Sequence, residues 1–120
     1  MSLFLILAAV ATAPSHVDVL TAEAIGIYRD CAVENALRLD DGKETVSVIA
    51  KAGLTACSNI RPKLLKTLTM GLMHRAGMPA TTENWSAAQR MASEELETVD
   101  SSIERKGELA LLEKRKKKKS

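Results

Sequence analysis

Three methionines and one histidine form a set of soft metal ligands in the second half of the chain. Met70, Met73, His74 and Met78 follow the spacing i, i+3, i+4, i+8, which would gather them on one side of a continuous helix. Thioether and imidazole ligands together suit Cu(I). Gly77, however, is expected to end the helix before Met78, and methionine mainly fills gaps in a core with few aromatic residues. We therefore predict no metal or other cofactor and keep Cu(I) binding as an alternative.

The two cysteines, Cys31 and Cys57, each fall on the inward stripe of an expected helix. If the chain is exported, the thiols are expected to oxidise and to join the two helices by a disulfide. Two free, buried thiols are the alternative. Redox catalysis is disfavoured, because such enzymes usually carry a Cys-x-x-Cys pair at a helix N-terminus, where the thiolate is stabilised.

Paired carboxylates occur at Asp40-Asp41 and at Glu94-Glu95. General acid–base catalysis needs two groups that converge on one pocket with separated pKa values, and adjacent residues on a turn or a solvated helix face do not converge. The sequence also lacks a Gly-rich phosphate loop and the motifs His-Glu-x-x-His and Gly-x-Ser-x-Gly. We therefore predict no catalytic residue and a protein that is not an enzyme.

The chain ends in a run of six basic residues: Lys114, Arg115, Lys116, Lys117, Lys118 and Lys119. The whole chain has a formal net charge of only +2, so the residues outside this run are net acidic, and attraction to a polyanion belongs to the run itself. Anionic membrane surfaces and nucleic acids are both candidate partners, although no aromatic residue is interleaved for base stacking. Because like charges repel and the run has no apolar side, we predict that residues 108–120 are disordered, with continuation of the fourth helix over residues 108–113 as the alternative.

Helices are expected to position these residues, because the chain is rich in Ala, Leu, Met and charged residues and has only three aromatic residues. The first helix is predicted from Asp18 or Thr21 to Leu39, with Asn35 interrupting its apolar stripe. That stripe consists of Leu20, Ala24, Ile27, Tyr28, Cys31 and Leu39. After a left-handed turn at Gly42, the spacing of Asp41 and Glu44 indicates the cap of a second helix over residues 44–60.

The second helix is followed by two more. Its own stripe consists of Val46, Ile49, Ala50, Gly53, Cys57 and Ile60. Pro62 ends or kinks it, and a third helix runs until Gly77 and Pro79. A fourth begins at a cap on Thr81 or Thr82 and weakens at Gly107, with a stripe of Trp85, Ala88, Ala92, Leu96, Val99 and Ile103. The sequence therefore predicts an all-α fold: a small hairpin or bundle of three to four helices with one inter-helix disulfide.

The first residues have the pattern of a secretory signal peptide. An apolar run from Leu3 to Val10 is followed by small residues that favour cleavage after Ala11. No Lys or Arg precedes the run, so an N-terminal helix packed in the core is the alternative. Eight residues span only ~12 Å as a helix, too short for the ~30 Å core of a bilayer. We predict a signal peptide over 1–11, a helical domain over 12–107 with His16 in its N-terminal coil, and a periplasmic or secreted location.

Two short motifs resemble a group of small, uncharacterised exported proteins of Gram-negative bacteria. They are Tyr28-Arg29-Asp30-Cys31 and the Ala-rich stretch from Ala50 to Cys57 that ends in Ala-Cys. The resemblance covers roughly residues 1–70; it implies a helical hairpin with a bridge and carries no activity. We expect an exported, non-enzymatic protein that presents an amphipathic helix face to another protein. Binding of an anionic membrane or nucleic acid through the basic run, and Cu(I) binding, are the alternatives.

Overall fold

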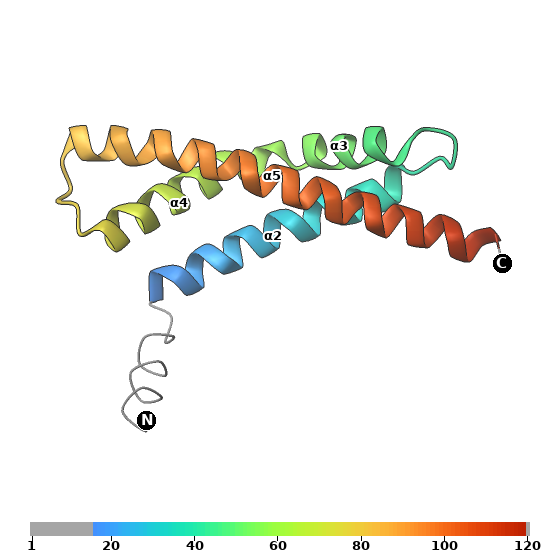
Figure 1. Ribbon diagram of the computed structural model, residues 1–120, viewed down its shortest axis with the longest axis horizontal. Coiled ribbons are helices and arrows are strands. Elements are labelled where there is room, and N and C mark those ends of the chain that lie inside the picture. The colour runs from blue at the N-terminus through green and yellow to red at the C-terminus, as the bar shows by residue number, and fades with distance from the viewer. Residues whose placement is uncertain (1–15, 120) are drawn as a thin grey trace, which may run out of the picture.

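The computed structural model describes residues 16–119, and its elements are helices (Figure 1). In chain order they are α2 (His16–Leu39), α3 (Val46–Ala56), the 3-10 turn η1 (Ser58–Ile60), α4 (Arg61–Ala76) and α5 (Thr82–Lys119). No residue in this range lies in a strand. The predicted all-α fold is confirmed, whereas the predicted signal peptide lies outside the described residues. Within the same range, no helix combines the length and hydrophobicity needed to cross a bilayer.

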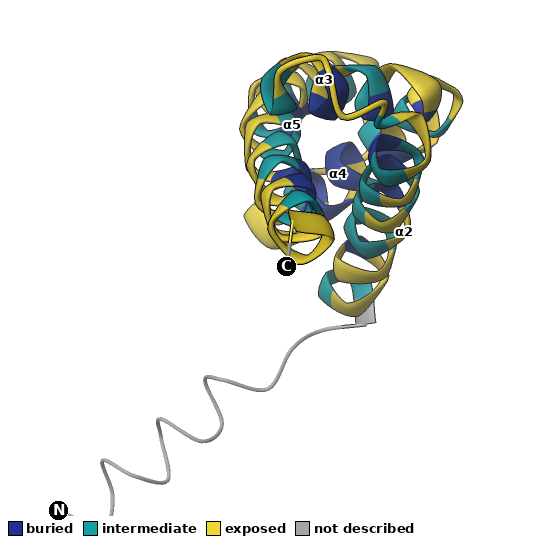
Figure 2. Cartoon of the chain, turned by 90° about the vertical axis from the view of Figure 1, so that its right-hand side faces the viewer, coloured by how far each residue is buried: buried dark blue, intermediate teal, exposed yellow. Residues whose placement is uncertain are grey.

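Helix α5 runs the length of the molecule and contacts the other three α-helices. Its first half lies along α4, and its second half lies beside α2 and α3, which form a hairpin (Figure 1). Seen along the bundle, the buried residues face an interior surrounded by the helices (Figure 2). The buried residues form two clusters, the larger around Tyr28, Leu64 and Leu96 and the smaller around Ala36 and Leu111. Helices α2 and α5 contribute to both clusters.

The inner face of α2 is built from Tyr28, Ala32 and Ala36, which recur every four residues and are all buried. The two alanines face Gly53 of α3, where an added Cβ would lie only 2.4 Å from the carbonyl O of Ala32. The backbones of α2 and α3 therefore approach so closely that only small side chains fit between them.

The predicted stripe of α2 is partly wrong. Ile27 is 62% exposed, and Leu20 and Leu39 are exposed as well. Hydrophobic periodicity favours the largest apolar side chains as the buried ones, whereas the contact with α3 has room only for alanines. On α3 the prediction is confirmed for Ile49, Ala50, Gly53 and Cys57, which are all buried.

The loop between α2 and α3 turns at Gly42, whose φ of 75° is the left-handed conformation predicted for it. The Asp41 carboxylate accepts the backbone N–H groups of Lys43 and, as the predicted cap requires, Glu44, but these bonds close a turn of the loop and the predicted helix start is wrong. Helix α3 begins instead at Val46, and the Thr45 hydroxyl caps it by accepting a backbone N–H three residues later at 3.3 Å.

The predicted second helix over 44–60 is shorter than expected. Helix α3 ends at Ala56 with Cys57 as its C-cap, and one 3-10 turn connects it to α4. Pro62 lies in the first turn of α4, where its missing N–H has no intrahelical partner to lose. Helix α4 ends as predicted at Gly77, which has a φ of 62°.

Helix α5 begins as predicted after Thr81, whose hydroxyl accepts the backbone N–H of Asn84 at 3.1 Å. Its inner face contains four buried residues of the predicted stripe, namely Ala88, Ala92, Leu96 and Ile103. At the opposite end of the chain, His16 is the first residue of α2, so its prediction as coil is wrong.

The disorder predicted for residues 108–120 is wrong for residues 108–119, which continue α5; the alternative of a helix over residues 108–113 is confirmed, and the helix extends beyond it. Gly107 lets α5 approach α3, because a Cβ there would lie 3.3 Å from Cβ of Ala50. One turn later Leu111 is fully buried against Ala36 and Ile49. Charge repulsion suggested disorder, but these apolar contacts hold the helix to the hairpin just before the basic run.

Candidate functional site

A disulfide joins Cys31 of α2 to Cys57 at the end of α3, with the Cα atoms 6.1 Å apart. The predicted bridge is therefore confirmed, and the alternative of two free thiols is wrong. The side-chain nitrogen of Asn35 lies 3.6 Å from the sulfur of Cys31 and 3.4 Å from that of Cys57, and donates a hydrogen bond to the carbonyl O of Cys31. The polar residue that interrupts the predicted stripe of α2 thus packs on the bridge.

The methionine and histidine set is divided between the core and the surface. Met73 is buried at the corner between α4 and α5, whereas Met70 and His74 are exposed. Gly77 ends α4 before Met78, so the helical spacing does not extend to the fourth residue. Among residues 16–119, no three His, Cys, Asp or Glu side chains gather as metal ligands would. Met73 is thus the methionine of the set that fills a gap in the core, the role that the sequence suggested.

Where α2, α4 and α5 meet, one carboxylate holds two other side chains. The Tyr28 hydroxyl donates to Oδ1 of Asp100 at 2.6 Å, and the Arg61 guanidinium donates to Oδ2 of Asp100 at 2.6 Å. These three residues line a cavity of about 440 Å³, whose other charged residues are Lys51 and Glu104. Because both oxygens of Asp100 are engaged, this network ties three helices together and leaves no free acid or base at its centre. Tyr28 belongs to the predicted stripe of α2, whereas Asp100 and Arg61 were not among the predicted site residues.

Burial, and then the hydrogen bond to Asp100, raise the pKa of Tyr28 to about 12. Tyr28 is the single tyrosine of the chain, so a spectrophotometric titration of the native protein is expected to show tyrosinate forming near pH 12. The stabilisation linked to this shift is complete below the ordinary pKa of 10 and is lost as the pH rises toward 12. The variant Asp100→Asn should move the titration back toward 10. A titration midpoint of 10 for Tyr28 in the unmodified protein would contradict the hydrogen-bond network with Asp100 and Arg61.

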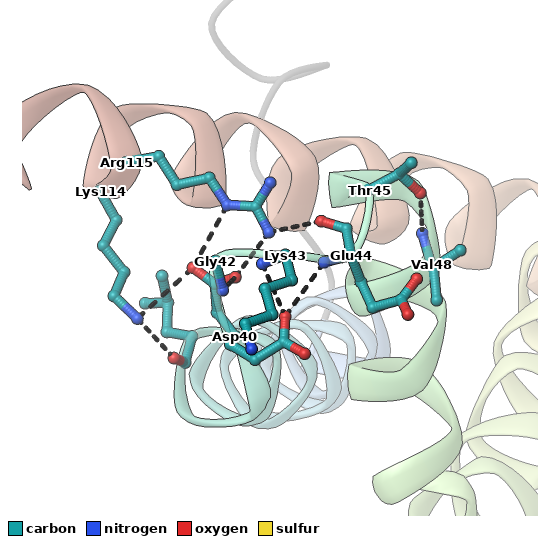
Figure 3. Close-up of polar contacts among 10 residues, drawn as sticks. Asp40, Gly42, Lys43, Glu44, Thr45, Val48, Lys114 and Arg115 are labelled. Carbon is teal, nitrogen blue, oxygen red and sulfur yellow. Dashed lines mark hydrogen bonds and ion pairs between the residues drawn. The ribbon is translucent and has the colours of Figure 1, made fainter. Parts of the chain in front are cut away.

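At the other end of the bundle, Asp40 holds two of the predicted basic residues (Figure 3). Asp40 directly follows α2, and its side chain is only 3% exposed. The Arg115 guanidinium donates to Oδ1 of Asp40 at 2.6 Å and to the carbonyl O of Glu44 at 2.7 Å. Lys114 donates to the carbonyl O of Leu37 at 2.9 Å and lies 3.6 Å from Oδ2 of Asp40. We call Asp40, Lys114 and Arg115 the Asp40 clamp.

The Asp40 clamp is expected to keep the end of α5 helical. The hydrogen bond from Arg115, and then that from the N–H of Gly42, lower the pKa of Asp40 to about 2. We predict that Asp40→Asn speeds amide hydrogen exchange over residues 108–119 and leaves residues 88–103 unchanged. Acidification should have the same effect: the stabilisation is complete above the ordinary pKa of 3.8 and is lost as the pH falls toward 2.

Glu113→Gln is the matched control for that experiment. Glu113 lies in the same segment, but its pairing with Lys117 at 3.8 Å is between two exposed side chains of one helix. Such pairs contribute little, so exchange should hardly change. Equal protection in the Asp40→Asn variant and the unmodified protein would show that the clamp does not order the helix.

The outer side of the end of α5 carries a stripe of apolar and basic side chains. We call it the α5 stripe; it consists of Arg105, Leu109, Leu112, Lys116 and Lys119. Steps of three and four residues place the five on one side of the helix, away from the buried Leu111. Leu109 and Leu112 are 55% and 52% exposed. Within the described part of the chain, the three cations of the stripe have no hydrogen-bond or ion-pair partner.

The six predicted basic residues therefore separate into groups. Lys114 and Arg115 belong to the Asp40 clamp, Lys117 pairs with Glu113, and Lys116 and Lys119 lie on the α5 stripe; Lys118 is exposed. The two exposed leucines, Leu109 and Leu112, were not predicted to act together with the basic run. Their spacing to Lys116 and Lys119 would have indicated the stripe, had the run been expected to be helical.

Comparisons of the chain with protein-family profiles, curated proteins and solved structures give no match. The fold and the contacts above define a small all-α protein with a disulfide-bridged hairpin and one long helix. Its functional interpretation rests on those contacts.

Proposed function

We propose that this chain is an exported, non-enzymatic helical protein that binds anionic lipid bilayers through the α5 stripe. The observation that carries the proposal is the exposure of Leu109 and Leu112 between unpaired cations on one side of a helix. Helices that lie in the interface of a membrane combine an apolar strip that enters the headgroup region with Lys and Arg that attract anionic lipids. Residues 105–119 contain eight basic and two acidic residues, so the charge favours an anionic surface.

The rest of the bundle supports the same role. The Asp40 clamp and the buried Leu111 hold the inner side of α5, so the α5 stripe is presented outward without refolding. Presentation in a fixed conformation lowers the conformational entropy lost on binding. The Cys31–Cys57 disulfide supports export, because such bridges persist in oxidising compartments. The apolar run at residues 3–10 has the composition of an export signal.

A lipid surface suits the α5 stripe better than nucleic acid does. Binding to a phosphate backbone needs basic side chains but gains nothing from exposed leucines, and single-stranded nucleic acid is usually bound by aromatic stacking. The stripe contains two leucines and no aromatic residue. A protein partner, the other expectation from the sequence, would also require a complementary surface that the chain itself does not identify.

Vesicle binding tests the proposal. The protein is expected to sediment with vesicles of phosphatidylglycerol and phosphatidylcholine and not with phosphatidylcholine alone. Lys116→Glu combined with Lys119→Glu should weaken binding by at least ~100-fold, because each basic residue near an anionic surface contributes on the order of 1 kcal/mol. Leu109→Gln combined with Leu112→Gln should weaken it by about tenfold at constant charge.

The matched control is the pair Lys63→Glu and Lys66→Glu on α4, where both lysines are exposed and far from the end of α5 (Figure 1). This control should bind as the unmodified protein does. Equal loss in the control would mean that net charge alone drives binding. The proposal would be overturned if the protein did not bind vesicles but bound duplex DNA strongly, with an affinity that the leucine substitutions leave unchanged. That result would identify nucleic acid as the partner.

A further inference from the structure

A surface cavity of about 310 Å³, open to solvent on one side, lies between α2 and α5, away from the Asp40 clamp. Its apolar lining consists of Ile25 from α2 and Val99 and Ile103 from α5. Ile103 is buried, and Ile25 and Val99 are half-buried at the edge of the larger core cluster. The cavity therefore has a hydrophobic wall that continues into the core, and a volume at the lower end of the range of small-molecule sites.

Two cations from different helices lie at the same cavity, Arg29 of α2 and Lys106 of α5. Arg29 donates through Nε to the neighbouring Asp30 at 3.1 Å, which leaves the terminal N–H groups of its guanidinium without a partner among residues 16–119. Lys106 is exposed and has no partner in the same range. Glu95 is the one carboxylate in the lining, and it lies 3.9 Å from Arg75. Lys106 is therefore the unpaired cation of this lining, and Arg29 keeps free N–H donors beside its ion pair with Asp30.

The cavity beside Tyr28 differs in this respect. There Arg61 is engaged by Asp100, and Glu104 balances Lys51. An anion placed in that cavity would meet two carboxylates, whereas an anion between α2 and α5 would meet donors that are free to bind it. Charge-assisted hydrogen bonds from Arg and Lys are the strong ones for carboxylates and phosphates.

We propose that the cavity between α2 and α5 binds an anionic amphiphile, a carboxylate or phosphate joined to an aliphatic chain. The chain would lie on Ile25, Val99 and Ile103, and the acidic group would accept hydrogen bonds from Arg29 and Lys106. The hydroxyls of Thr98 and Ser102, which also line the cavity, offer additional polar contacts. A free fatty acid and a single anionic phospholipid share this chemistry. The inference goes beyond bilayer binding, because none of these residues belongs to the α5 stripe.

Calorimetric titration with monomeric dodecanoate tests this site. Dodecanoate is expected to bind at one site per protein, whereas dodecyl maltoside, which has the chain without the charge, and acetate, which has the charge without the chain, should not bind. A short-chain phosphatidylglycerol below its micelle concentration distinguishes the two sources. If it displaces dodecanoate, the site accepts a phospholipid headgroup; if it does not, the site is specific for the free acid.

Arg29→Gln and Lys106→Gln should each weaken dodecanoate binding by about tenfold or more, since each removes a charge-assisted hydrogen bond. Arg29→Lys keeps the charge and should retain most of the affinity for dodecanoate. This variant controls for loss of folding at the site. Lys63→Gln, which removes an exposed cation elsewhere, should have no effect. Unchanged affinity in both Gln variants, equal binding of dodecyl maltoside, or no binding of dodecanoate would overturn the proposal.

The variant Lys116→Glu with Lys119→Glu separates this inference from the proposed function. It should lose vesicle binding and keep dodecanoate binding. A different result would overturn the cavity as a binding site: the unmodified protein does not bind dodecanoate, and the Arg29 and Lys106 variants lose vesicle binding. Both cations would then belong to the membrane-binding surface.

Discussion

Replacing Gly53 with alanine is expected to destabilise the fold by about 3 kcal/mol, the upper part of the usual range for overpacking. The added Cβ would lie 2.4 Å from the carbonyl O of Ala32 and 2.9 Å from both the backbone N and the Cβ of Ala36. These are two backbone atoms and one Cβ of α2, and their positions do not depend on any side-chain rotamer. A change of rotamer therefore cannot relieve the contact. The two helices must separate, and the buried surface between them is lost. Denaturant unfolding followed by circular dichroism measures the effect.

Gly26→Ala is the matched control, since it makes the same substitution in the middle of α2. The new Cβ would lie 3.6 Å from the flexible guanidinium of Arg29, which is an ordinary contact. Alanine is the better helix former, so this variant should be more stable by roughly 0.5–1 kcal/mol. The two substitutions are thus expected to have opposite signs. If Gly53→Ala is tolerated as well as Gly26→Ala, the close approach of α2 and α3 is wrong.

Removing the disulfide has a comparable expected effect. Cys31 and Cys57 are 26 residues apart, and in the chain-entropy model the closure of such a loop stabilises the folded state by ~3.5 kcal/mol. Small domains have total stabilities of about 5–15 kcal/mol, so this is a large fraction. The double variant Cys31→Ala and Cys57→Ala should therefore unfold at a much lower denaturant concentration.

The reductant dependence provides the control for this prediction. The unmodified protein should lose stability when a strong reductant is added, and the double alanine variant should be insensitive to it. Equal unfolding midpoints for the oxidised protein and the double variant would contradict a stabilising role of the bridge. A reductant effect that persists in the double variant would point to a cause other than the disulfide.

The helical architecture was predictable because local signals and tertiary packing agree. Gly77 and Pro62 mark real helix boundaries, and the alternation of small and large apolar residues on α5 matches its buried side. On α2 the periodicity missed Ala32 and Ala36 of the inner face, whose small size matters only when the distance to α3 is known. The helix cap was misplaced because both Asp41 and Thr45 have suitable side chains, and only the loop geometry distinguishes them.

The site was less predictable, because its contacts join residues distant in sequence. Tyr28 and Asp100 are separated by 72 residues, and Asp40 and Arg115 by 75. No periodicity relates such residues; the parallel course of α2 and α5 brings them together. The basic run was recognised from its charge alone, but its helical form depends on Leu111 and Asp40. The pairing of the cysteines was accessible because only two are present.

Helix α5, which contributes to both clusters of the core, follows the other described helices in sequence. During synthesis the α2–α3 hairpin leaves the ribosome with its inner alanines uncovered, and neither cluster can close until Leu96 and then Leu111 have followed. Contacts between the two ends of a chain form slowly, because closing a long loop costs entropy before the contacts stabilise it. The α2–α3 hairpin thus lacks part of its core contacts until α5 has been synthesised, because Leu96 and Leu111 belong to the two clusters.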